Sequence, residues 1–583
     1  MRLIADIETD GLLETLTKIH VIAAANADDI SQRWVFGPDR IGEGVKLLSQ
    51  ASELIMHNGI AFDIPAIQKI YPSFSVDEIT VTDTLVLSRL IRPDLKNEDF
   101  LSDDLPKKLH GSHSLKAWGQ RLGELKGDFG ETTDWSVWTQ EMQDYCEQDV
   151  TVTHKLWEAL APHTWSEKAI RFEHQLAELC HRIGRAGWNF DMDKAAVLYG
   201  QLSQERSELE HELLELFPAW TVEEEFIPKV NNKKLGYVKG EPFIKRKTIE
   251  FNPNSRKHIE FCLRQKYKWK PKVFTPSGGA KIDETTLADL PFPEAQKLAR
   301  SFMIQKRLGM LAEGNAAWMK LMDKDGKLRH TINSLGTISG RCSSFAPNLQ
   351  QVPAVRAEFG AECRELFTVP EGYQLVGVDL SGIELRCLAH FMQDGGAYAK
   401  EILEGDIHSA NAAAMGISRS EAKVAVYCMI YGGGDKRLGE AVNGSAREGK
   451  ALRQRFYKNN PAFEALLRAV AEAVRKRKHL TGLDGRQLLA RSEHGQLNVL
   501  LQSAAALIAK QWVRLIDQAI KQEKLDAEII AFVHDEVQIK VKGDAEYVGN
   551  LARRMAQEAG RFFRFNIPIE AEFRVGKNWA DTH

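Results

Sequence analysis

The stretch from Leu375 to Arg386 constrains the fold more than any other part of this chain. Its apolar start, Leu375 to Val378, predicts a buried strand, but that strand stops at Asp379 instead of continuing with apolar residues. A Ser-Gly pair follows and predicts a turn, and the apolar spacing that begins at Ile383 predicts a helix. A carboxylate at the tip of a buried strand can meet both solvent and a metal ion. The sequence therefore predicts a strand, a turn and a helix around a candidate metal ligand.

A second acidic stretch, Ile529 to Lys540, supplies the partner that a two-metal site needs. An apolar strand runs up to His534-Asp535-Glu536, and the next residues alternate as a second strand, so acids lie at the turn of a hairpin. If the strand ending at Asp379 lies beside this hairpin, Asp379 and Asp535 can hold two metal ions for in-line phosphoryl transfer. A single strand-end Asp is usually a cap or a turn residue. The prediction therefore depends on both stretches together.

Length and composition limit the class of protein. The 583 residues suffice for several domains, and the formal net charge of −3 means that any field attracting nucleic acid must be local. The seven cysteines lack metal-ligand spacing, which is typical of free thiols in a reducing compartment. No apolar run approaches the roughly 18 residues of a membrane span, and the N-terminus is no signal peptide. We therefore expect a protein without membrane association, in the cytoplasm.

Four carboxylates in the first 160 residues form a second candidate centre. Residues 3–10 alternate as a strand, so Asp6 and Glu8 share one face and repel each other unless a cation lies between them. Asp63 follows another strand, and Tyr145 and Asp149 share one face of a predicted helix. The four acids could close around two metals, with the Tyr145 hydroxyl orienting an attacking water.

Polar side chains on two predicted helices suit a nucleotide and a base pair. Arg419, Lys423, Tyr427 and Tyr431 recur at every fourth residue and form one slanting stripe of two cations and two aromatic rings. That order suits a triphosphate followed by a sugar and a base.

Two further segments suit DNA. Asn498 and Gln502 lie one turn apart on an apolar helix and suit minor-groove acceptors, with a buried amide network as the alternative. A Gly-, Ser- and Arg-rich stretch at 336–353 suits contacts with phosphates and minor-groove edges, through Arg341 and Gln351.

These motifs resemble those of known families. The stretches around Asp379 and Asp535 resemble motifs A and C of the family A DNA polymerases, and the stripe from Arg419 to Tyr431 resembles motif B. The T-x-x-G-R and N-L-Q-x-x-P segments at 337–353 also match. In the N-terminal region, the D-x-E, N-x3-F-D and Y-x3-D motifs resemble those of DEDD 3′–5′ exonucleases. The resemblance covers essentially the whole chain and is closest to the replicative polymerases of T7-like short-tailed phages.

The resemblance implies an α/β and α+β multidomain fold. An RNase H-like 3′–5′ exonuclease domain (1–160) is expected before a right-hand polymerase with a thumb (165–330) and a palm and fingers (331–583, fingers about 395–500). It implies template-directed extension of a primer 3′ end with dNTPs, proofreading, and replication of a phage genome. Two Mg²⁺ ions are implied in each polymerase site and two in each exonuclease site.

The implied roles follow the matching positions. Asp379, Asp535 and the backbone carbonyl of Leu380 are implied metal ligands, with Glu536 nearby and less essential. Glu384 is implied to exclude a ribose 2′-hydroxyl. The implied nucleotide contacts are His408, Arg419 and Lys423 to phosphates, Tyr427 to the sugar and Tyr431 to the template by stacking. His534 and His583 are implied DNA-binding residues. Asp83 and Ser112, in segments that also resemble the nuclease class, are expected to cap helices.

The implied partners are primer–template DNA and dNTPs, and a phage helicase-primase and single-stranded DNA-binding protein are compatible with them. Some relatives bind thioredoxin through a long thumb insertion. The stretch between Phe217 and Phe251 is much shorter, which argues against thioredoxin binding here. Its lysine-rich part, Lys229 to Lys247, is expected to be a loop or hairpin, either contacting duplex phosphates or simply solvated. Gly482 to Gln487 is expected either to contact the template or to be a solvated helix end.

Three other functions are compatible with parts of the sequence. A repair-type DNA polymerase would show low processivity and prefer gaps. A nucleic-acid-binding protein without activity would not need intact carboxylates at every site. A single-subunit RNA polymerase is excluded as far as Glu384 acts against ribonucleotides.

Overall fold

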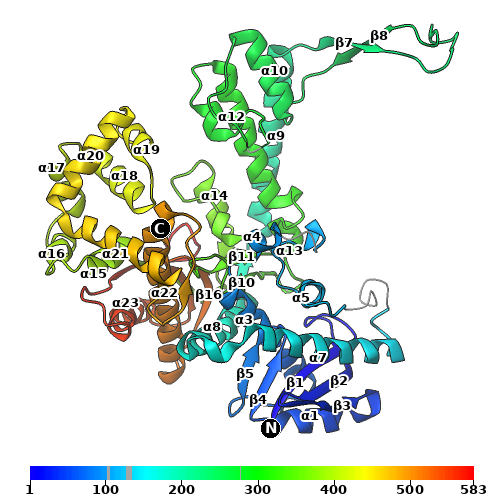
Figure 1. Ribbon diagram of the computed structural model, residues 1–583, viewed down its shortest axis with the longest axis vertical. Helices are drawn as coiled ribbons and strands as arrows, with labels where there is room; N and C mark the ends of the chain where they lie inside the picture. Colours follow the sequence, from blue (N-terminus) through cyan, green and yellow to red (C-terminus); the bar gives the residue numbers. More distant parts are fainter. Residues whose placement is uncertain (102–104, 126–133, 276) are drawn as a thin grey trace. The chain divides into compact units, whose positions relative to one another are not determined.

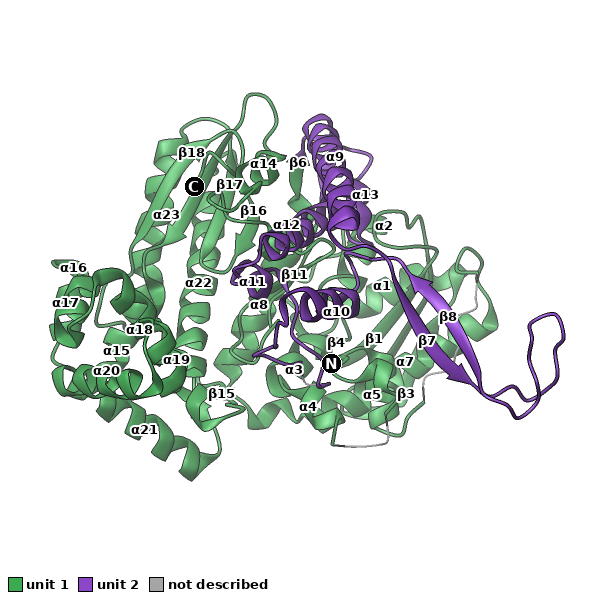
Figure 2. Ribbon diagram, turned by 90° about the horizontal axis from the view of Figure 1, so that it is seen from above, with its two compact units in different colours: residues 1–189, 329–583 green, residues 190–328 purple. Residues whose placement is uncertain are grey.

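The computed structural model describes residues 1–101, 105–125, 134–275 and 277–583. These residues form two compact units, one made of residues 1–189 and 329–583 and the other of residues 190–328 (Figure 2). The units are described separately.

The first unit begins with a mixed five-stranded sheet, here called the N-terminal sheet, in the order β3-β2-β1-β4-β5 (Figure 1). Its strands are β1 (Arg2–Thr9), β2 (Ile19–Asn26), β3 (Asp29–Phe36), β4 (Glu53–Met56) and β5 (Thr80–Asp83). The helices around it are α1 (Ile41–Ser49), α2 (Asp63–Ile70), α3 (Thr84–Ile91), α4 (Leu95–Asp99), α5 (Leu115–Arg121) and α7 (Gln140–Leu160). Alternate residues of β1 pack against α1 and α2, whereas Ile4 packs against α7. Because side chains alternate along a strand, Asp6 and Glu8 also face α7.

A second sheet, here called the C-terminal sheet, is antiparallel in the order β16-β17-β13-β18. Its strands are β13 (Gln374–Leu380), β16 (Ala527–Val533), β17 (Glu536–Val541) and β18 (Ala571–Gly576). Val376, Val378 and Leu380 share one buried core with α8 (Glu167–Ala186), α22 (Gln496–Gln522) and α23 (Ala545–Phe562). Gly377 and Asp379 therefore point to the opposite face. A Cβ at Gly377 would lie 2.5 Å from the Cβ of Thr582, so the segment after β18 lies directly on that face.

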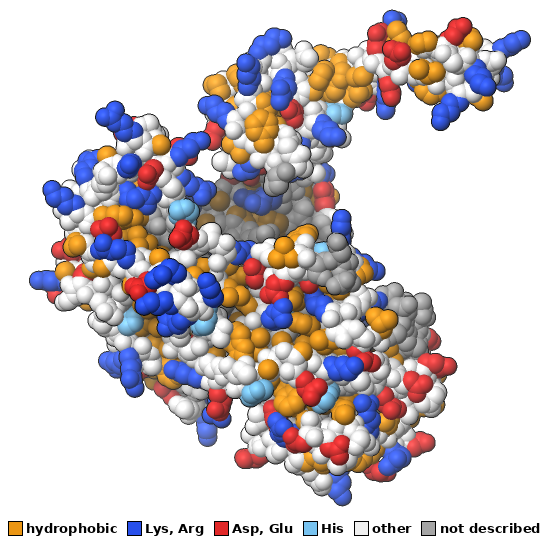
Figure 3. All heavy atoms as spheres, viewed as in Figure 1, with side chains coloured by type: hydrophobic (Ala, Val, Ile, Leu, Met, Phe, Trp, Pro, Cys, Tyr) orange, Lys and Arg blue, Asp and Glu red, His pale blue; other side chains and the backbone are white. Residues whose placement is uncertain are grey.

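A helical region separates β13 from β16. It consists of α15 (Ile383–Met392), α16 (Ala397–Leu403), α17 (Ile407–Met415), α18 (Arg419–Ile430), α19 (Asp435–Glu440), α20 (Ala446–Asn459), α21 (Pro461–Arg477) and the short hairpin β14–β15 (Leu480–Thr481, Gln487–Leu488). A capping box of Ser418 and Glu421 starts α18. Lys and Arg side chains are frequent on the face of this region in Figure 3, so basic charge is local although the whole chain is slightly acidic.

Short elements precede β13. They are β6 (Trp188–Phe190), β10 (Thr331–Asn333), β11 (Ser343–Phe345), α14 (Gly360–Glu365) and β12 (Phe367–Thr368). β10 and β11 pair as an antiparallel hairpin, which holds the loop that carries Arg341.

The second unit is mainly helical. It contains α9 (Met192–Leu216), α10 (Arg256–Tyr267), α11 (Glu284–Ala288), α12 (Pro293–Leu308), α13 (Trp318–Leu321) and the paired strands β7 (Trp220–Phe226) and β8 (Phe243–Ile249), with β9 (Lys327–Leu328) at its end. The strands project from the helices as a ribbon (Figure 1). This ribbon confirms that the lysine-rich stretch is a hairpin rather than a helix, and Glu223 pairs with Arg246 across it.

The helix α22 is long and apolar enough to span a membrane, with a mean hydropathy of 1.3 over its most apolar window. Of that window, 83% is buried inside the protein. Its apolar side chains pack in the core shared with the C-terminal sheet. The composition of α22 is therefore that of a core helix, and no other helix among the described residues is long and apolar enough.

Candidate functional site

Asp379 and Asp535 lie on neighbouring strands of the C-terminal sheet. The backbone N–H of Leu380 donates to the carbonyl oxygen of Asp535 at 3.0 Å, and Asp379 is paired with Glu536 in the β13–β17 register. The turn between β16 and β17 places His534 in the left-handed region, at a φ of 59°, and leaves its side chain exposed. Two strand tips from distant parts of the sequence thus bring the two predicted metal ligands together.

The electrostatics at these tips favour a bound cation. Asp379 is exposed at the strand tip, but desolvation by the surrounding protein and the nearby carboxylates of Asp535, Glu536 and Glu572 raise its pKa to about 7. Burial also raises the pKa of Asp535, although His534 and Arg341 oppose that rise. Carboxylates that repel one another are stabilised as anions when a divalent cation lies between them. Sequence reasoning missed Glu572, although residues 571–575 alternate as a strand and Glu572 lies opposite Asp379.

Glu536 differs from the two aspartates because protein donors already hold it. Its Oε1 accepts from Trp579 Nε1 at 2.6 Å and from Gln538 Nε2 at 2.7 Å, and lies 3.1 Å from His583 Nε2. Burial tends to raise the pKa of Glu536, but His583, Gln538 and Arg364 outweigh it and lower the pKa overall. In this structure, Glu536 and His583 hold the segment after β18 in place through their contact with each other. Their predicted roles at the reaction centre stay predictions.

Removing the charge of Asp379 is expected to stabilise the metal-free protein at pH 8. The pKa of Asp379 is about 7 in the folded protein against an ordinary value of 3.8, so folding favours the neutral acid. Its stabilising contribution is full below the unfolded pKa and is lost as the pH rises through 7. Asp379→Asn should therefore melt at a higher temperature than the wild type in EDTA at pH 8. The difference should shrink at pH 5, and Mg²⁺ should raise the wild-type melting temperature more than that of the variant. A variant that melts lower than the wild type at pH 8 would contradict this electrostatic account.

Glu384 is held between two of the other predicted residues. Its Oε1 accepts from Arg341 Nη2 at 2.7 Å, and its Oε2 accepts from the Tyr431 hydroxyl at 2.7 Å. Burial raises the pKa of Tyr427, and the charges of Glu384 and Asp535 add to that rise, so its hydroxyl lies near both acids. The rings of Tyr427 and Tyr431 are 6.1 Å apart. Arg341, predicted to contact DNA, is thus bound to Glu384 in this structure.

The predicted phosphate contacts gather at the start of α17 and α18. Burial lowers the pKa of His408, and the charges of Lys423 and Arg419 lower it further, so the three groups lie close together. The Nδ1 of His408 is buried without a hydrogen-bond partner among the described residues. Arg419 Nε donates to Asp406 Oδ2 at 2.6 Å, so a bound phosphate would compete with this carboxylate. Sequence reasoning did not identify Asp406 as the partner of Arg419.

The predicted minor-groove residues are placed differently. Gln351 is exposed, whereas Asn498 and Gln502 on α22 are half-buried. Asn498 Oδ1 has no hydrogen-bond partner among the described residues, which leaves an acceptor for a donor from outside the chain. The alternative prediction, a buried amide network around Asn498, therefore does not agree with the structure.

The N-terminal acids converge at one end of β1. Asp63, the first residue of α2, is 4% exposed, and its carboxylate accepts from the backbone N–H of Ile7. Burial raises the pKa of Asp63 to about 7, with Asp83 and Asp149 contributing, although hydrogen bonds from its own and the Ile7 backbone N–H oppose the rise. The thiol of Cys146 donates to Asp6 Oδ2 at 3.5 Å. Sequence reasoning counted Cys146 only as a free thiol.

The expected helix caps were half right. Asp83 caps α3 by accepting from the backbone N–H of Leu85, and it also accepts from Asn58 and Ile60. The cap of α5 is Ser114, not Ser112, because the Ser114 side chain accepts from Ala117. Ser112 donates to Ser114 Oγ instead, so the prediction missed the cap by two residues.

A basic cleft of about 790 Å³ is lined in part by His57 and Asn58, and the backbone N–H of Asn58 donates to Asp83. Its lining combines residues after β4 and around α5 with the loop after β10, and its charged or titratable side chains are those of His57, Arg89, Lys96, His113 and Lys116. Burial, together with the charges of Arg89 and Arg121, lowers the pKa of His113 to about 3, so its ring is neutral at pH 7. Among the residues that the structure describes, the lining includes no Asp or Glu, which suits a polyanion.

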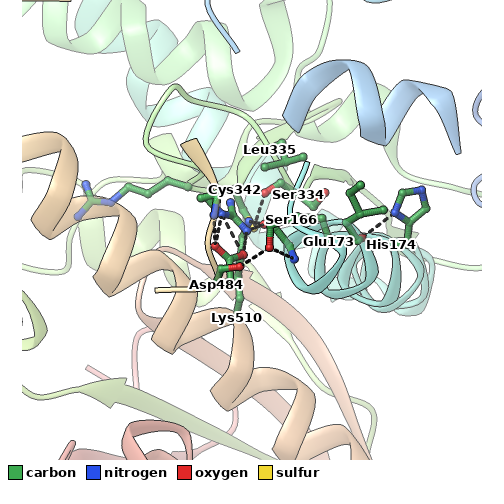
Figure 4. A network of polar contacts seen from close by, with 12 residues as sticks. Ser166, Glu173, His174, Ser334, Leu335, Cys342, Asp484 and Lys510 are labelled. Carbon is green, nitrogen blue, oxygen red and sulfur yellow. Dashed lines mark hydrogen bonds and ion pairs between the residues drawn. The ribbon is translucent and has the colours of Figure 1, made fainter. Parts of the chain in front are cut away.

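A buried ionic network lies between α8, the β14–β15 turn and α22 (Figure 4). Glu173 Oε1 accepts from Arg486 Nη2 at 2.6 Å and from Lys510 Nζ at 2.7 Å, and Asp484 also binds Arg486. All four charged residues are at most 2% exposed. Arg486 is therefore neither a template contact nor part of a solvated helix end, because its partners bury it completely.

Comparison with known proteins agrees with this geometry. A model of DNA polymerase family A matches residues 232–581, and a model of the RNase H superfamily matches residues 3–161. The DNA-directed DNA polymerases of Escherichia phage T7 and Enterobacteria phage T3 are each 33% identical, over 100% of this chain and 100% of the relative. A solved POL domain of Pol1 from M. smegmatis, in complex with DNA primer-template and dNTP, has a TM-score of 0.76 at 18% identity, covering 99% of this chain and 95% of that one.

Proposed function

This chain belongs to DNA polymerase family A, and we propose that it extends primer 3′ ends with dNTPs and trims mispaired ends in its RNase H-like domain. The observation that carries the proposal is the convergence of Asp379 and Asp535 on adjacent strand tips. Full-length similarity to two phage enzymes favours replication of a phage genome over a repair role. The compact unit of residues 190–328 supports most of the proposed thumb (165–330), whereas α8 lies within those bounds but belongs to the first unit. The palm and fingers (331–583) are proposed from the family resemblance.

The strand-tip acids would hold the divalent cations on which the family depends. The Asp379 and Asp535 carboxylates and the Leu380 backbone carbonyl offer oxygen donors, which suit Mg²⁺, and we propose two ions per site. Bound there, Mg²⁺ would activate the primer 3′-hydroxyl and stabilise the charge of the leaving pyrophosphate. Glu536, already held by Trp579 and Gln538, keeps the sheet face rigid beneath the reacting groups.

The residues beside the acids would bind the incoming dNTP. His408, Arg419 and Lys423 would bind its phosphates, with Arg419 exchanging Asp406 for the nucleotide. Tyr427 would contact the sugar, and Tyr431 would stack on the template. Glu384, fixed by Arg341 and Tyr431, would fill the space that a 2′-hydroxyl needs.

The N-terminal acids would hydrolyse the primer end. Asp6, Glu8, Asp63 and Asp149 would hold two Mg²⁺ ions, and Tyr145 would orient the attacking water. The basic cleft would bind the single-stranded 3′ end through its phosphates, with affinity that falls as salt rises. Its lining from both domains suits a strand that passes from one centre to the other.

Asp6→Ala tests whether extension and trimming take place at separate centres. The variant should extend a primer–template as the wild type does, because Asp6 lies in the N-terminal domain. Its 3′ trimming should fall by at least about a hundredfold, as expected when a major electrostatic contact of the reaction is lost. The assay measures extension with dNTPs or rNTPs and trimming without nucleotides, at equal protein and Mg²⁺. The proposed function would be refuted if the wild type added no dNTP to the primer, or if it added rNTPs as well as dNTPs.

The remaining assignments follow from the family and stay predictions. We propose that the protein acts as a monomer in the cytoplasm of the host, on primer–template DNA. A phage helicase-primase and a single-stranded DNA-binding protein are the further partners that the family resemblance suggests. The ribbon β7–β8 is shorter than a thioredoxin-binding insertion, so we propose that thioredoxin is not a partner.

A further inference from the structure

We propose that Cys146 makes the exonuclease centre a mixed oxygen–sulfur site, which binds thiophilic divalent cations such as Zn²⁺ or Cd²⁺ in place of Mg²⁺. The proposal rests on the proposed exonuclease function. Its basis is a cluster: one ligand atom each from Asp6, Glu8 and Cys146 all lie within 4.8 Å of one another. Among the described residues, this is the one group of three or more His, Cys, Asp or Glu side chains that meets that distance.

The positions of the three side chains follow from the fold. Asp6 and Glu8 face α7 from β1, and Cys146 faces β1 from α7, where it packs against Ile4, Val21 and Ala23. The thiol is 0% exposed, and it contacts Asp6 through both the backbone carbonyl at 3.4 Å and Oδ2 at 3.5 Å. The sulfur therefore reaches the polar end of the strand from an otherwise apolar layer.

The donor set decides which ions fit. Zn²⁺ binds thiolate sulfur at about 2.3 Å and carboxylate oxygen at about 2.0–2.2 Å, so its ligand atoms lie within 4.8 Å of one another. Mg²⁺ takes oxygen ligands and keeps several waters, and gains nothing from a sulfur atom. The same centre can thus bind Mg²⁺ through its carboxylates alone and a softer ion through Cys146 as well.

Binding of the softer ion involves no oxidation. The S–H bond of Cys146 breaks, a sulfur–metal bond forms, and the proton leaves to solvent. The hydrogen bond from the thiol to Asp6 is replaced by a metal that both groups share. The polymerase centre has only oxygen donors in Asp379 and Asp535, so the two centres of one chain differ in their preference for soft ions.

The direct test is a Cd²⁺ titration of the full-length protein without Mg²⁺, followed by the ultraviolet charge-transfer absorption of the sulfur–cadmium bond. The wild type should show a saturable band at one equivalent. Cys146→Ser keeps the size of the side chain and its hydrogen bond to Asp6 but lacks sulfur, so its band should be absent. Cys428→Ser is the matched control, because Cys428 is the cysteine with some exposure and should leave the band unchanged. An equal band in wild type and Cys146→Ser overturns the proposal.

A functional measurement separates this proposal from the exonuclease assignment. With Mg²⁺ alone, wild type and Cys146→Ser should both trim a primer. If neither trims, the exonuclease function fails, while the cadmium band still decides the metal proposal. With added Zn²⁺, trimming by the wild type should halve at a concentration at least about tenfold lower than for Cys146→Ser, since losing even an outer-shell partner of a metal costs about 10–100-fold in affinity. Primer extension by the wild type should tolerate that concentration. If Cys146→Ser does not fold, Cys146→Ala provides the same comparison, and equal Zn²⁺ sensitivity of a folded variant and wild type refutes the proposal.

Discussion

Replacing Asp379 by alanine lowers primer extension by at least about a thousandfold and leaves 3′ trimming intact. Asp379 lies at the tip of β13, beside Asp535, and the repulsion among these carboxylates is relieved by a bound cation or by protonation. Without Asp379 the site loses a metal ligand and the field that stabilises charge developing on the phosphates, an effect on the order of 10²–10³ for a single preorganised contact and larger for a ligand. The measurement is single-turnover extension of a labelled primer, with trimming assayed on the same preparation.

Two companion variants sharpen this result. Asp535→Ala should lose as much activity as Asp379→Ala, and the double variant little more, because residues acting as one unit are not additive. Glu572→Gln is the matched control: it removes a neighbouring charge opposite Asp379 but no predicted ligand, and should keep extension within about tenfold, or about 1.4 kcal/mol of barrier. Extension by Asp379→Ala at the level of the Glu572 variant would show that the strand tips are not the reaction centre.

Replacing Glu173 by alanine destabilises the first unit by about 3–5 kcal/mol, the cost of leaving a buried charge uncompensated. Glu173 accepts hydrogen bonds from both Arg486 and Lys510, and none of the three is more than 2% exposed. Its loss leaves two cations facing the single carboxylate of Asp484. Because a multidomain chain need not unfold in one step, the measurement compares the denaturant midpoint of the transition that includes this unit.

Exposed and compensated variants test that explanation. Glu43→Ala breaks an exposed pair with Arg40 in the same unit and should leave the denaturant midpoint nearly unchanged. Combining Glu173→Ala with Lys510→Met restores neutrality and fills the space with an apolar chain, so the double variant should be more stable than Glu173→Ala alone. If Glu173→Ala costs no more than Glu43→Ala, the network does not stabilise the unit.

The sequence predicted the family, the fold class and the strand-tip acids because those features are local. An apolar strand that ends in Asp379 and a hairpin whose turn carries Asp535 are each visible within a dozen residues. The family resemblance then supplied their pairing, which the β13–β17 register reproduces. The hairpin in the lysine-rich stretch was also predictable, because Gly, Pro and Asn interrupt it.

The parts that sequence reasoning missed depend on distant partners. Arg486 lies 313 residues from Glu173 in the sequence. No feature of the sequence around Gly482 to Gln487 indicates that the Arg486 guanidinium binds a buried carboxylate. Cys146 meets Asp6 only because α7 covers β1. Asp406 and Glu572 likewise acquire their neighbours from the packing of separate elements. The periodicity of a sequence predicts the face of a helix or strand on which a side chain lies. It does not predict which side chain of another element contacts that side chain.

The helix α8 is bonded to the N-terminal region and to the C-terminal region through two consecutive residues. His174 Nε2 accepts from the backbone N–H of Asp83, which also binds the turn before Asp63, while Glu173 binds Arg486 and Lys510. The same helix thus joins both regions within one compact unit. On the proposed function, we expect a mispaired primer end to melt from its template and migrate across this unit before it is trimmed.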